Sequence, residues 1–201
     1  MEIKRNIHLE RLIKSKHNGM IKVVTGIRRC GKSYLLMNLF RQHLLDGGVN
    51  ESHIIMLDLE NRRNKKLRDP DALLEWIDSQ IIEYKAFGDV PQEEWYYVML
   101  DEVQLVPEFE DVLNSYLSIK NVDIYVTGSN SRFLSKDVIT EFRGRGHEIH
   151  ITPLSMSEFV DAHPEMTFEE ALDQYMTYGG LPMVCLQPDV KEKEAYLKGL
   201  F

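Results

Sequence analysis

One eight-residue segment constrains this chain more than any other. Residues 26–33 read GIRRCGKS and fit the phosphate-loop pattern G-x-x-x-x-G-K-[ST] without a mismatch. Gly26 and Gly31 let the backbone turn tightly and bring its N–H groups against phosphate oxygens. Lys32 supplies an ammonium group for the β- and γ-phosphates, and the hydroxyl of Ser33 is a ligand for Mg²⁺. The segment therefore predicts a site for a nucleoside triphosphate.

The sequence on either side of this loop meets the structural requirement of the motif. Residues 20–25 form a short segment rich in β-branched and apolar residues, which is typical of a buried strand. Residues 33–41 carry apolar side chains at helical spacing without Gly or Pro. Strand, glycine-rich loop and helix is the order that a phosphate loop needs, which makes a chance match a poor explanation. The candidate nucleotide contacts are Gly26, Ile27, Arg28, Arg29, Cys30, Gly31, Lys32, Ser33 and Tyr34.

The rest of the chain alternates between predicted strands and predicted helices. Four further apolar strand segments follow the first, at 52–59, 94–100, 122–127 and 147–151. Helical patterns occur at 4–17, 33–41, 69–85, from Pro107 onward, and at 133–142. This alternation predicts an α/β fold with a five-stranded, mostly parallel sheet covered by helices on both faces.

The pattern changes near residue 153 and is helical only from Ser155 onward. We therefore divide the chain into an α/β core, residues 1–153, and a helical region, residues 154–201. The helical pattern continues to Phe201 without a polar tail. We hypothesise that the sequence is a fragment and that residues beyond 201 complete a second module.

A second acidic segment is a candidate for the metal and the chemistry. The apolar residues 96–100 lead into Asp101 and Glu102, an arrangement known in phosphate-loop enzymes as Walker B. Asp101 would hold Mg²⁺ through its water shell, and Glu102 would polarise a water for in-line attack on the γ-phosphate. Alone, such a pair is better explained as a helix cap or surface charge. Beside an intact phosphate loop, the metal and base roles become the stronger interpretation.

Two polar segments are further candidates for catalytic roles. Ser129 and Asn130 close the fourth predicted strand, at the edge where parallel sheets bind ligands, so either could fix the attacking water. They would serve equally well as caps of the next helix. Arg143 and Arg145 precede the fifth strand. Either is an arginine finger that stabilises charge across a subunit interface, or both are solvated surface residues.

Composition limits the partners. A net charge of −8 disfavours nucleic acid without excluding it, and we interpret the basic segment 61–68 (NRRNKKLR) chiefly as a solvated loop. Contact with phosphate or with a neighbouring subunit is the alternative for that loop. No apolar stretch has the length of a membrane span and the N-terminus lacks a signal-peptide core, so we expect a cytoplasmic protein without membrane contact. Cys30 is either an inert part of the loop or a thiol that nucleotide protects from alkylation.

Six segments, taken in order, resemble those of the AAA+ superfamily of ATPases. The resemblance is closest to bacterial and archaeal ATPases that carry an N-terminal AAA+ domain and a C-terminal domain of unknown function. The segments are GIRRCGKS at 26–33, LDEVQ at 100–104, TGSNS at 127–131, GRG at 144–146, PLSMSEF at 153–159 and YGGLP at 178–182. The resemblance implies a P-loop NTPase fold with a small, incomplete helical lid that starts near Ser155.

The resemblance also implies roles for individual residues. Lys32, Ser33, Asp101 and Glu102 would take the Walker roles, Ser129 or Asn130 would be the sensor, and Arg143 or Arg145 the finger. One departure concerns the lid, where many relatives carry an arginine that reaches the γ-phosphate. Here Met183 follows the Gly180-Leu181-Pro182 turn, which puts lid-coupled sensing of ATP in doubt.

The expected function is Mg²⁺-dependent ATP hydrolysis, completed by an arginine from a neighbouring subunit of a homo-oligomer. ATP is preferred over GTP because no N-K-x-D motif follows the fourth strand and because the resemblance to AAA+ ATPases implies ATP. The alternative is an ATP-gated switch or scaffold with little turnover that acts on protein partners. A nucleic-acid motor is a weaker third hypothesis, because the chain is acidic.

Overall fold

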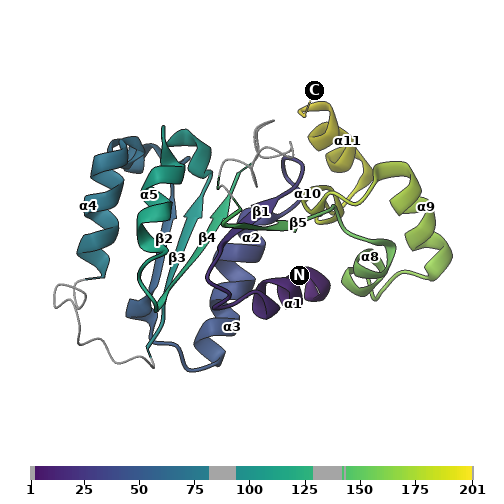
Figure 1. The fold of residues 1–201 in the computed structure, drawn as a ribbon. Coiled ribbons are helices and arrows are strands. Elements are labelled where there is room, and N and C mark those ends of the chain that lie inside the picture. Colours follow the sequence, from purple (N-terminus) through teal and green to yellow (C-terminus); the bar gives the residue numbers. More distant parts are fainter. Residues whose placement is uncertain (1–2, 82–93, 129–141, 143, 201) are drawn as a thin grey trace.

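The computed structural model of the chain describes residues 3–81, 94–128, 142 and 144–200. Within them, five strands form one sheet in the order β2-β3-β4-β1-β5, and all four neighbouring pairs are parallel (Figure 1). The strands are β1 Ile21–Thr25, β2 Ile54–Asp58, β3 Tyr96–Asp101, β4 Val122–Thr127 and β5 Gly146–His150. The predicted α/β fold with a five-stranded parallel sheet is therefore confirmed.

Helices cover both faces of this sheet. On one face, α4 (Pro70–Gln80) and α5 (Phe109–Tyr116) pack on the strands through side chains such as Leu73, Ile77 and Leu113. On the other face lie α1 (Asn6–Lys14) and the helix after the phosphate loop. Because both faces are covered, every residue of β1 and β3 is buried, as expected of central parallel strands.

The helix after the phosphate loop is longer than the sequence predicts. It runs without interruption from Lys32 to Asp46 as α2 (Lys32–Tyr34), η1 (Leu35–Phe40) and α3 (Arg41–Asp46), and its middle part is π-helical. Leu35, Leu36 and Phe40 are fully buried against the sheet. The described part of the α/β region also contains 3₁₀ helices, namely η2 Glu51–His53, η3 Arg62–Arg68 and η5 Val103–Leu105. The helix predicted at 133–142 lies, except for Phe142, outside the described residues.

Four helices follow the last strand and lie beside its edge of the sheet (Figure 1). They are α8 Met156–Ala162, α9 Phe168–Tyr178, α10 Pro182–Cys185 and α11 Val190–Lys198. We refer to residues 154–200 as the C-terminal helices. Their apolar cluster includes Leu154, Phe159 and Cys185. Ile3 joins this cluster from the N-terminal segment, by which we mean residues 3–14. Helices fill this region as predicted, and its separation from the core at residue 153 stays a prediction.

A buried ion pair lies at the end of the sheet opposite the phosphate loop. Lys22 on β1 pairs with Asp123 on β4, and the two side chains are 0% and 3% exposed. The backbone N–H of His17 and the hydroxyl of Tyr125 both donate to the second oxygen of Asp123, at 3.1 and 2.7 Å. Lys22 Nζ also donates to the carbonyl of Met20. The buried charges are therefore paired and hydrogen-bonded, which is what makes their burial tolerable.

No helix within the described ranges is both long enough and apolar enough to cross a membrane.

Candidate functional site

The phosphate loop joins the end of β1 to the start of α2, and its backbone needs glycine at two positions. Gly26 has φ 145° and Gly31 has φ 97°, values that side chains with a Cβ rarely adopt. A Cβ on Gly26 would overlap the carbonyl oxygen of Ile151 and lie 2.9 Å from Cys30 Sγ. The loop is therefore pressed against the chain that leaves β5, and this close approach fixes its course.

The ammonium group of Lys32 lies inside the curve of the loop. Its Nζ donates to the carbonyl oxygens of Gly26 and Ile27, both at 3.0 Å, and the residue is only 4% exposed. Lys32 is also the first residue of the long helix, whose amino end carries partial positive charge. The Lys32 ammonium and the amino end of the helix thus place positive charge at the loop, which favours an anion there.

Three oxygen-bearing side chains from separate elements meet beside the loop. Ser33 Oγ donates to Asp101 Oδ1 at 2.9 Å, and the hydroxyl of Thr127 donates to the same oxygen. Asp101 is 7% exposed, and this burial raises the pKa of its carboxyl group. The two hydroxyl donors counteract that rise, while the charges of Glu102 and Asp58 add to it. A cation at this position would favour the ionised form of Asp101.

The donor set at this position fits Mg²⁺. A hydroxyl and a carboxylate are hard oxygen ligands, and Mg²⁺ normally keeps several waters and takes phosphate oxygens for the remaining positions. Among the described residues, no group of three or more His, Cys, Asp or Glu side chains is placed to hold a metal ion. The described residues therefore provide no site for a cation held mainly by protein carboxylates or imidazoles.

Glu102 has a strained backbone at the end of β3. Its φ of 56° lies in the left-handed region, which costs about 1–3 kcal/mol for such a residue. Its N–H donates to Thr127 Oγ1 at 3.0 Å, and its carboxylate accepts a hydrogen bond from the amide of Gln104. Strain of this kind persists where the surrounding structure holds it, and the Glu102 residue that carries it lines the pocket beside the loop.

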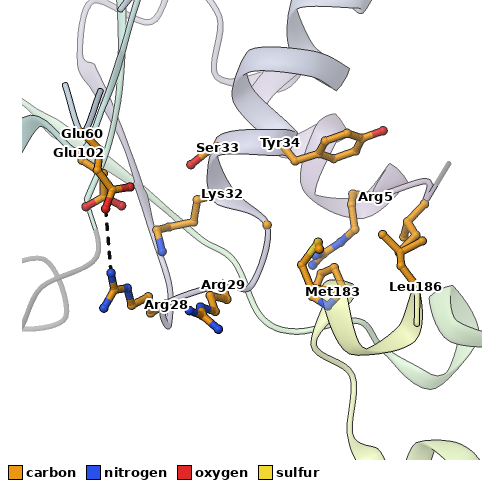
Figure 2. A pocket seen from close by; sticks show the side chains of 13 residues that line it. Arg5, Arg28, Arg29, Lys32, Ser33, Tyr34, Glu60, Glu102, Met183 and Leu186 are labelled. Atoms are coloured by element: carbon orange, nitrogen blue, oxygen red, sulfur yellow. Dashed lines mark ion pairs between the residues drawn. The ribbon is translucent and has the colours of Figure 1, made fainter. Parts of the chain in front are cut away.

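The pocket beside the loop has a volume of about 550 Å³, within the usual range for small-molecule sites. Figure 2 shows its two ends. Glu60 and Glu102 lie at one end with Lys32 and the exposed Arg28, which pairs with Glu60 at 3.9 Å. Arg5, Tyr34, Met183 and Leu186 lie at the other end, on the N-terminal segment, the first turn of the long helix and α10. Ile3 and Pro182 also line the pocket.

The structure brings many of the predicted site residues together. Those that line the pocket are Arg28, Arg29, Gly31, Lys32, Ser33, Tyr34 and Glu102. Asp101 is not among the lining residues, but it accepts a hydrogen bond from Ser33, which is. Gly26 does not line the pocket, but its close approach to Ile151 fixes the course of the loop. Ile27 is 47% exposed and does not line the pocket either. Cys30 is fully buried, and burial raises the pKa of its thiol.

Arg145 does not join this site. It precedes β5, whose first residue pairs with Ile21 at the start of β1, whereas the phosphate loop leaves the other end of β1. The two positions are separated by the length of that strand, about 13 Å. Arg145 is exposed at that end of the sheet. Ser129, Asn130 and Arg143 lie outside the described residues.

The sequence alone does not predict several residues of the site. Thr127 is a hydroxyl residue at the end of a predicted strand, and Gln104 belongs to LDEVQ, but the sequence indicates no contact for either. Arg5 and Glu60, which also line the pocket, carry no local sequence signal. The apolar residues of α10 could not be placed, because their position depends on how the C-terminal helices fold back.

Comparison with known proteins identifies relatives along the whole chain. Residues 18–160 match the model of a protein family described as an AAA domain. An uncharacterized protein of Haemophilus influenzae is 34% identical over 203 residues, which cover 99% of this chain and 48% of that protein. A second, from Methanocaldococcus jannaschii, is 30% identical and is matched over 99% of this chain and 44% of its own length. The chain therefore spans about half the length of the curated relatives it matches.

Solved structures share the fold. The Walker-type ATPase of Pyrococcus abyssi matches with a TM-score of 0.66 at 19% identity, covering 99% of this chain and 73% of that chain. The Aeropyrum pernix ORC1 protein, solved in complex with DNA, matches with a TM-score of 0.53 at 13% identity, covering 100% of this chain and 66% of that chain. At these identities the likeness concerns the fold alone.

Proposed function

The chain belongs to the AAA domain family, and on that premise we propose that it binds ATP with Mg²⁺ in the pocket beside residues 26–33 and hydrolyses the γ-phosphate. The observation that carries the proposal is the meeting of the Lys32 ammonium, the Ser33 hydroxyl and the Asp101 carboxylate. Lys32 and Ser33 are neighbours at the start of α2, and Asp101 comes from the end of β3, 68 positions after Ser33. A triphosphate and its cation are the ligands that this set of charges suits best.

The two ends of the pocket suit the two ends of the nucleotide. The polar end, with Lys32 and Ser33, would take the phosphates, and the apolar end, with Met183 and Leu186, would take the base. Mg²⁺ held by Ser33 and Asp101 would neutralise the phosphate charge that the Lys32 ammonium group leaves uncompensated. Thr127 would keep the Asp101 carboxylate oriented through its hydrogen bond.

Glu102 would act as the general base. Its carboxylate would accept a proton from a water molecule while the water oxygen attacks the γ-phosphorus, and ADP would leave as the bond to its terminal oxygen breaks. The amide of Gln104 would hold that carboxylate in place through its hydrogen bond. We further propose that Ser129 or Asn130 contacts the reacting groups, and that Arg143 or Arg145 serves the site of a neighbouring subunit.

A second candidate function is an ATP-gated switch or scaffold that acts on protein partners with little turnover. The observation that favours it is Met183, which lines the pocket where an arginine would be expected from the C-terminal helices. In this alternative, nucleotide would be bound with slow turnover because the lid supplies no arginine to the γ-phosphate. Nucleic acid stays the disfavoured partner because of the net charge of −8.

The test compares phosphate release by the wild type, Glu102→Gln and Glu108→Gln at several protein concentrations. Glu108 is a matched control, since it is an exposed glutamate with the same left-handed backbone (φ 53°) that does not line the pocket. We expect Glu102→Gln to lower kcat by about 10²–10⁴-fold with little change in nucleotide affinity. A rate per subunit that rises with concentration supports catalysis between subunits. Tight binding without release supports the switch, and equal loss in both variants contradicts the role of Glu102.

A further inference from the structure

Arg5 is a buried charge that joins three separate parts of the chain. It is only 3% exposed, and each nitrogen of its guanidinium group has a partner. Nη1 donates to the carbonyl of Cys30 at 2.9 Å, Nη2 to the carbonyl of Thr152 at 2.6 Å, and Nε to Glu158 Oε1 at 3.0 Å. These partners belong to the phosphate loop, to the segment that leaves β5 and to α8. One side chain therefore connects the loop to the C-terminal helices.

The contact with Glu158 reaches the start of α8. The other carboxylate oxygen of Glu158 accepts hydrogen bonds from the N–H and the hydroxyl of Ser155, at 2.9 and 3.2 Å, in the capping box that begins this helix. The Glu158 side chain is 11% exposed, so the pair with Arg5 is largely shielded from water. Loss of the cation would leave a nearly buried carboxylate without its partner, which disfavours the docked position of α8.

The contact with Cys30 reaches the nucleotide pocket. Cys30 immediately precedes Gly31, and a Cβ on Gly31 would lie 3.6 Å from both Arg5 Nη1 and Pro182. Arg5 itself lines the pocket between the loop and α10, as Figure 2 shows. The planar guanidinium group fixes three acceptors in one geometry, which the single ammonium group of a lysine cannot reproduce.

We propose that Arg5 is a positioning residue that docks the C-terminal helices onto the phosphate loop and so assembles the nucleotide pocket. This inference rests on the proposed function. The C-terminal helices supply Met183 where the resemblance to AAA+ ATPases implies an arginine. In this chain the guanidinium group that links helices and loop comes from the N-terminal segment instead. It acts on the loop backbone and on Glu158, and it need not contact the phosphates.

The test uses the full chain and four variants: Arg5→Met, Arg5→Lys, Glu158→Gln and Arg11→Met. Arg11 is the matched control, because it is an exposed arginine on the same N-terminal segment and does not line the pocket. Hydrogen exchange of the α8 and β3 amides is measured without nucleotide. KM and kcat for MgATP, and the Kd of a fluorescent ATP analogue, are measured separately.

We expect Arg5→Met to speed exchange in α8 about tenfold or more while β3 stays protected. KM and the Kd of the analogue should rise by a similar factor, with kcat within about twofold of wild type. Arg5→Lys should recover part of the loss, and Glu158→Gln should act in the same direction. Glu158→Gln also covers the case in which Arg5→Met does not fold.

Three results would overturn the proposal. The first is identical exchange and KM in the Arg5 and Arg11 variants. The second is equal acceleration in α8 and β3, which would mean general destabilisation. The third is a Glu158→Gln variant that exchanges like the wild type in α8. If the wild type binds no nucleotide, the proposed function fails, whereas faster exchange confined to α8 would still establish the link made by Arg5.

Discussion

Replacement of Gly26 by alanine separates backbone strain from steric overlap at the phosphate loop. Gly26 combines φ 145° with a Cβ position that overlaps the carbonyl of Ile151 and lies 2.9 Å from Cys30 Sγ. Real Cβ contacts essentially never fall below 3.0 Å, so either the loop or the chain after β5 must move. Gly48 is the matched control. Its φ is 86°, and nothing lies within 4 Å of a Cβ built there.

The expected magnitudes follow from these geometries. An unfavourable φ costs about 1–3 kcal/mol, and both variants carry this cost. Overpacking against structure that has to shift costs a further ~1–3 kcal/mol, and only Gly26→Ala carries it. We therefore expect the free energy of unfolding to fall by about 1–3 kcal/mol in Gly48→Ala and by about 2–6 kcal/mol in Gly26→Ala.

Urea unfolding followed by circular dichroism measures both values. With a slope of about 2 kcal/mol per molar urea, the two midpoints should differ by roughly 1 M. Nucleotide affinity should fall in Gly26→Ala and stay unchanged in Gly48→Ala, because only the first lies in the loop. Equal midpoints for the two variants would refute the close approach of the loop to Ile151.

Three further predictions concern stability and reactivity. Asp123→Asn should lower the free energy of unfolding by about 3–5 kcal/mol in urea, since it leaves the buried Lys22 without its counter-charge. Cys30 and Cys185 should resist thiol reagents at about pH 8 until the protein is unfolded, because burial raises the pKa of both thiols, that of Cys185 to about 11. Burial lowers the pKa of His17 from 6.5, so unfolding takes up a proton and stability should fall as the pH drops below about 6.5. The fall between about pH 7.5 and about pH 5.5 should be smaller in His17→Asn, measured by urea unfolding at both values.

Each of these predictions has a clear contrary outcome. Glu10→Gln removes the acid of an exposed pair with Lys14 and should change stability by less than about 1 kcal/mol, so an equal effect of Asp123→Asn would contradict the burial argument. Rapid labelling of either cysteine in the folded protein would contradict their enclosure. An undiminished loss of stability in His17→Asn at acid pH would assign that loss to other groups.

The parallel sheet and its strands could be predicted because their signals are local. Apart from Lys22, residues 20–25 and 96–100 are apolar, β-branched or aromatic, and the glycines of the phosphate loop mark the turn between strand and helix. Residues at the carboxyl ends of parallel strands meet at one edge, so Ser33 and Asp101 could be expected near each other. The structure brings their side chains to 2.9 Å.

The rest depends on contacts that no local pattern encodes. Arg5 and Glu158 are separated by 153 positions, and nothing around either residue identifies the other as its partner. The left-handed backbone of Glu102 arises from the turn at the end of β3, beside Thr127. Residue propensity favours neither this turn nor a left-handed glutamate. In the sequence, Met183 stands only where an arginine is missing, whereas its place in the wall of the pocket follows from the packing of α10.

Calorimetric titration of the folded protein with ATP and Mg²⁺ tests the central claim most directly. The account predicts saturable heat at one site per chain for the wild type, weaker binding when Mg²⁺ is chelated, and loss of binding in Lys32→Ala. Absence of heat from well-folded wild-type protein, or equal affinity of the wild type and Lys32→Ala, would contradict the assignment of the pocket to a nucleoside triphosphate.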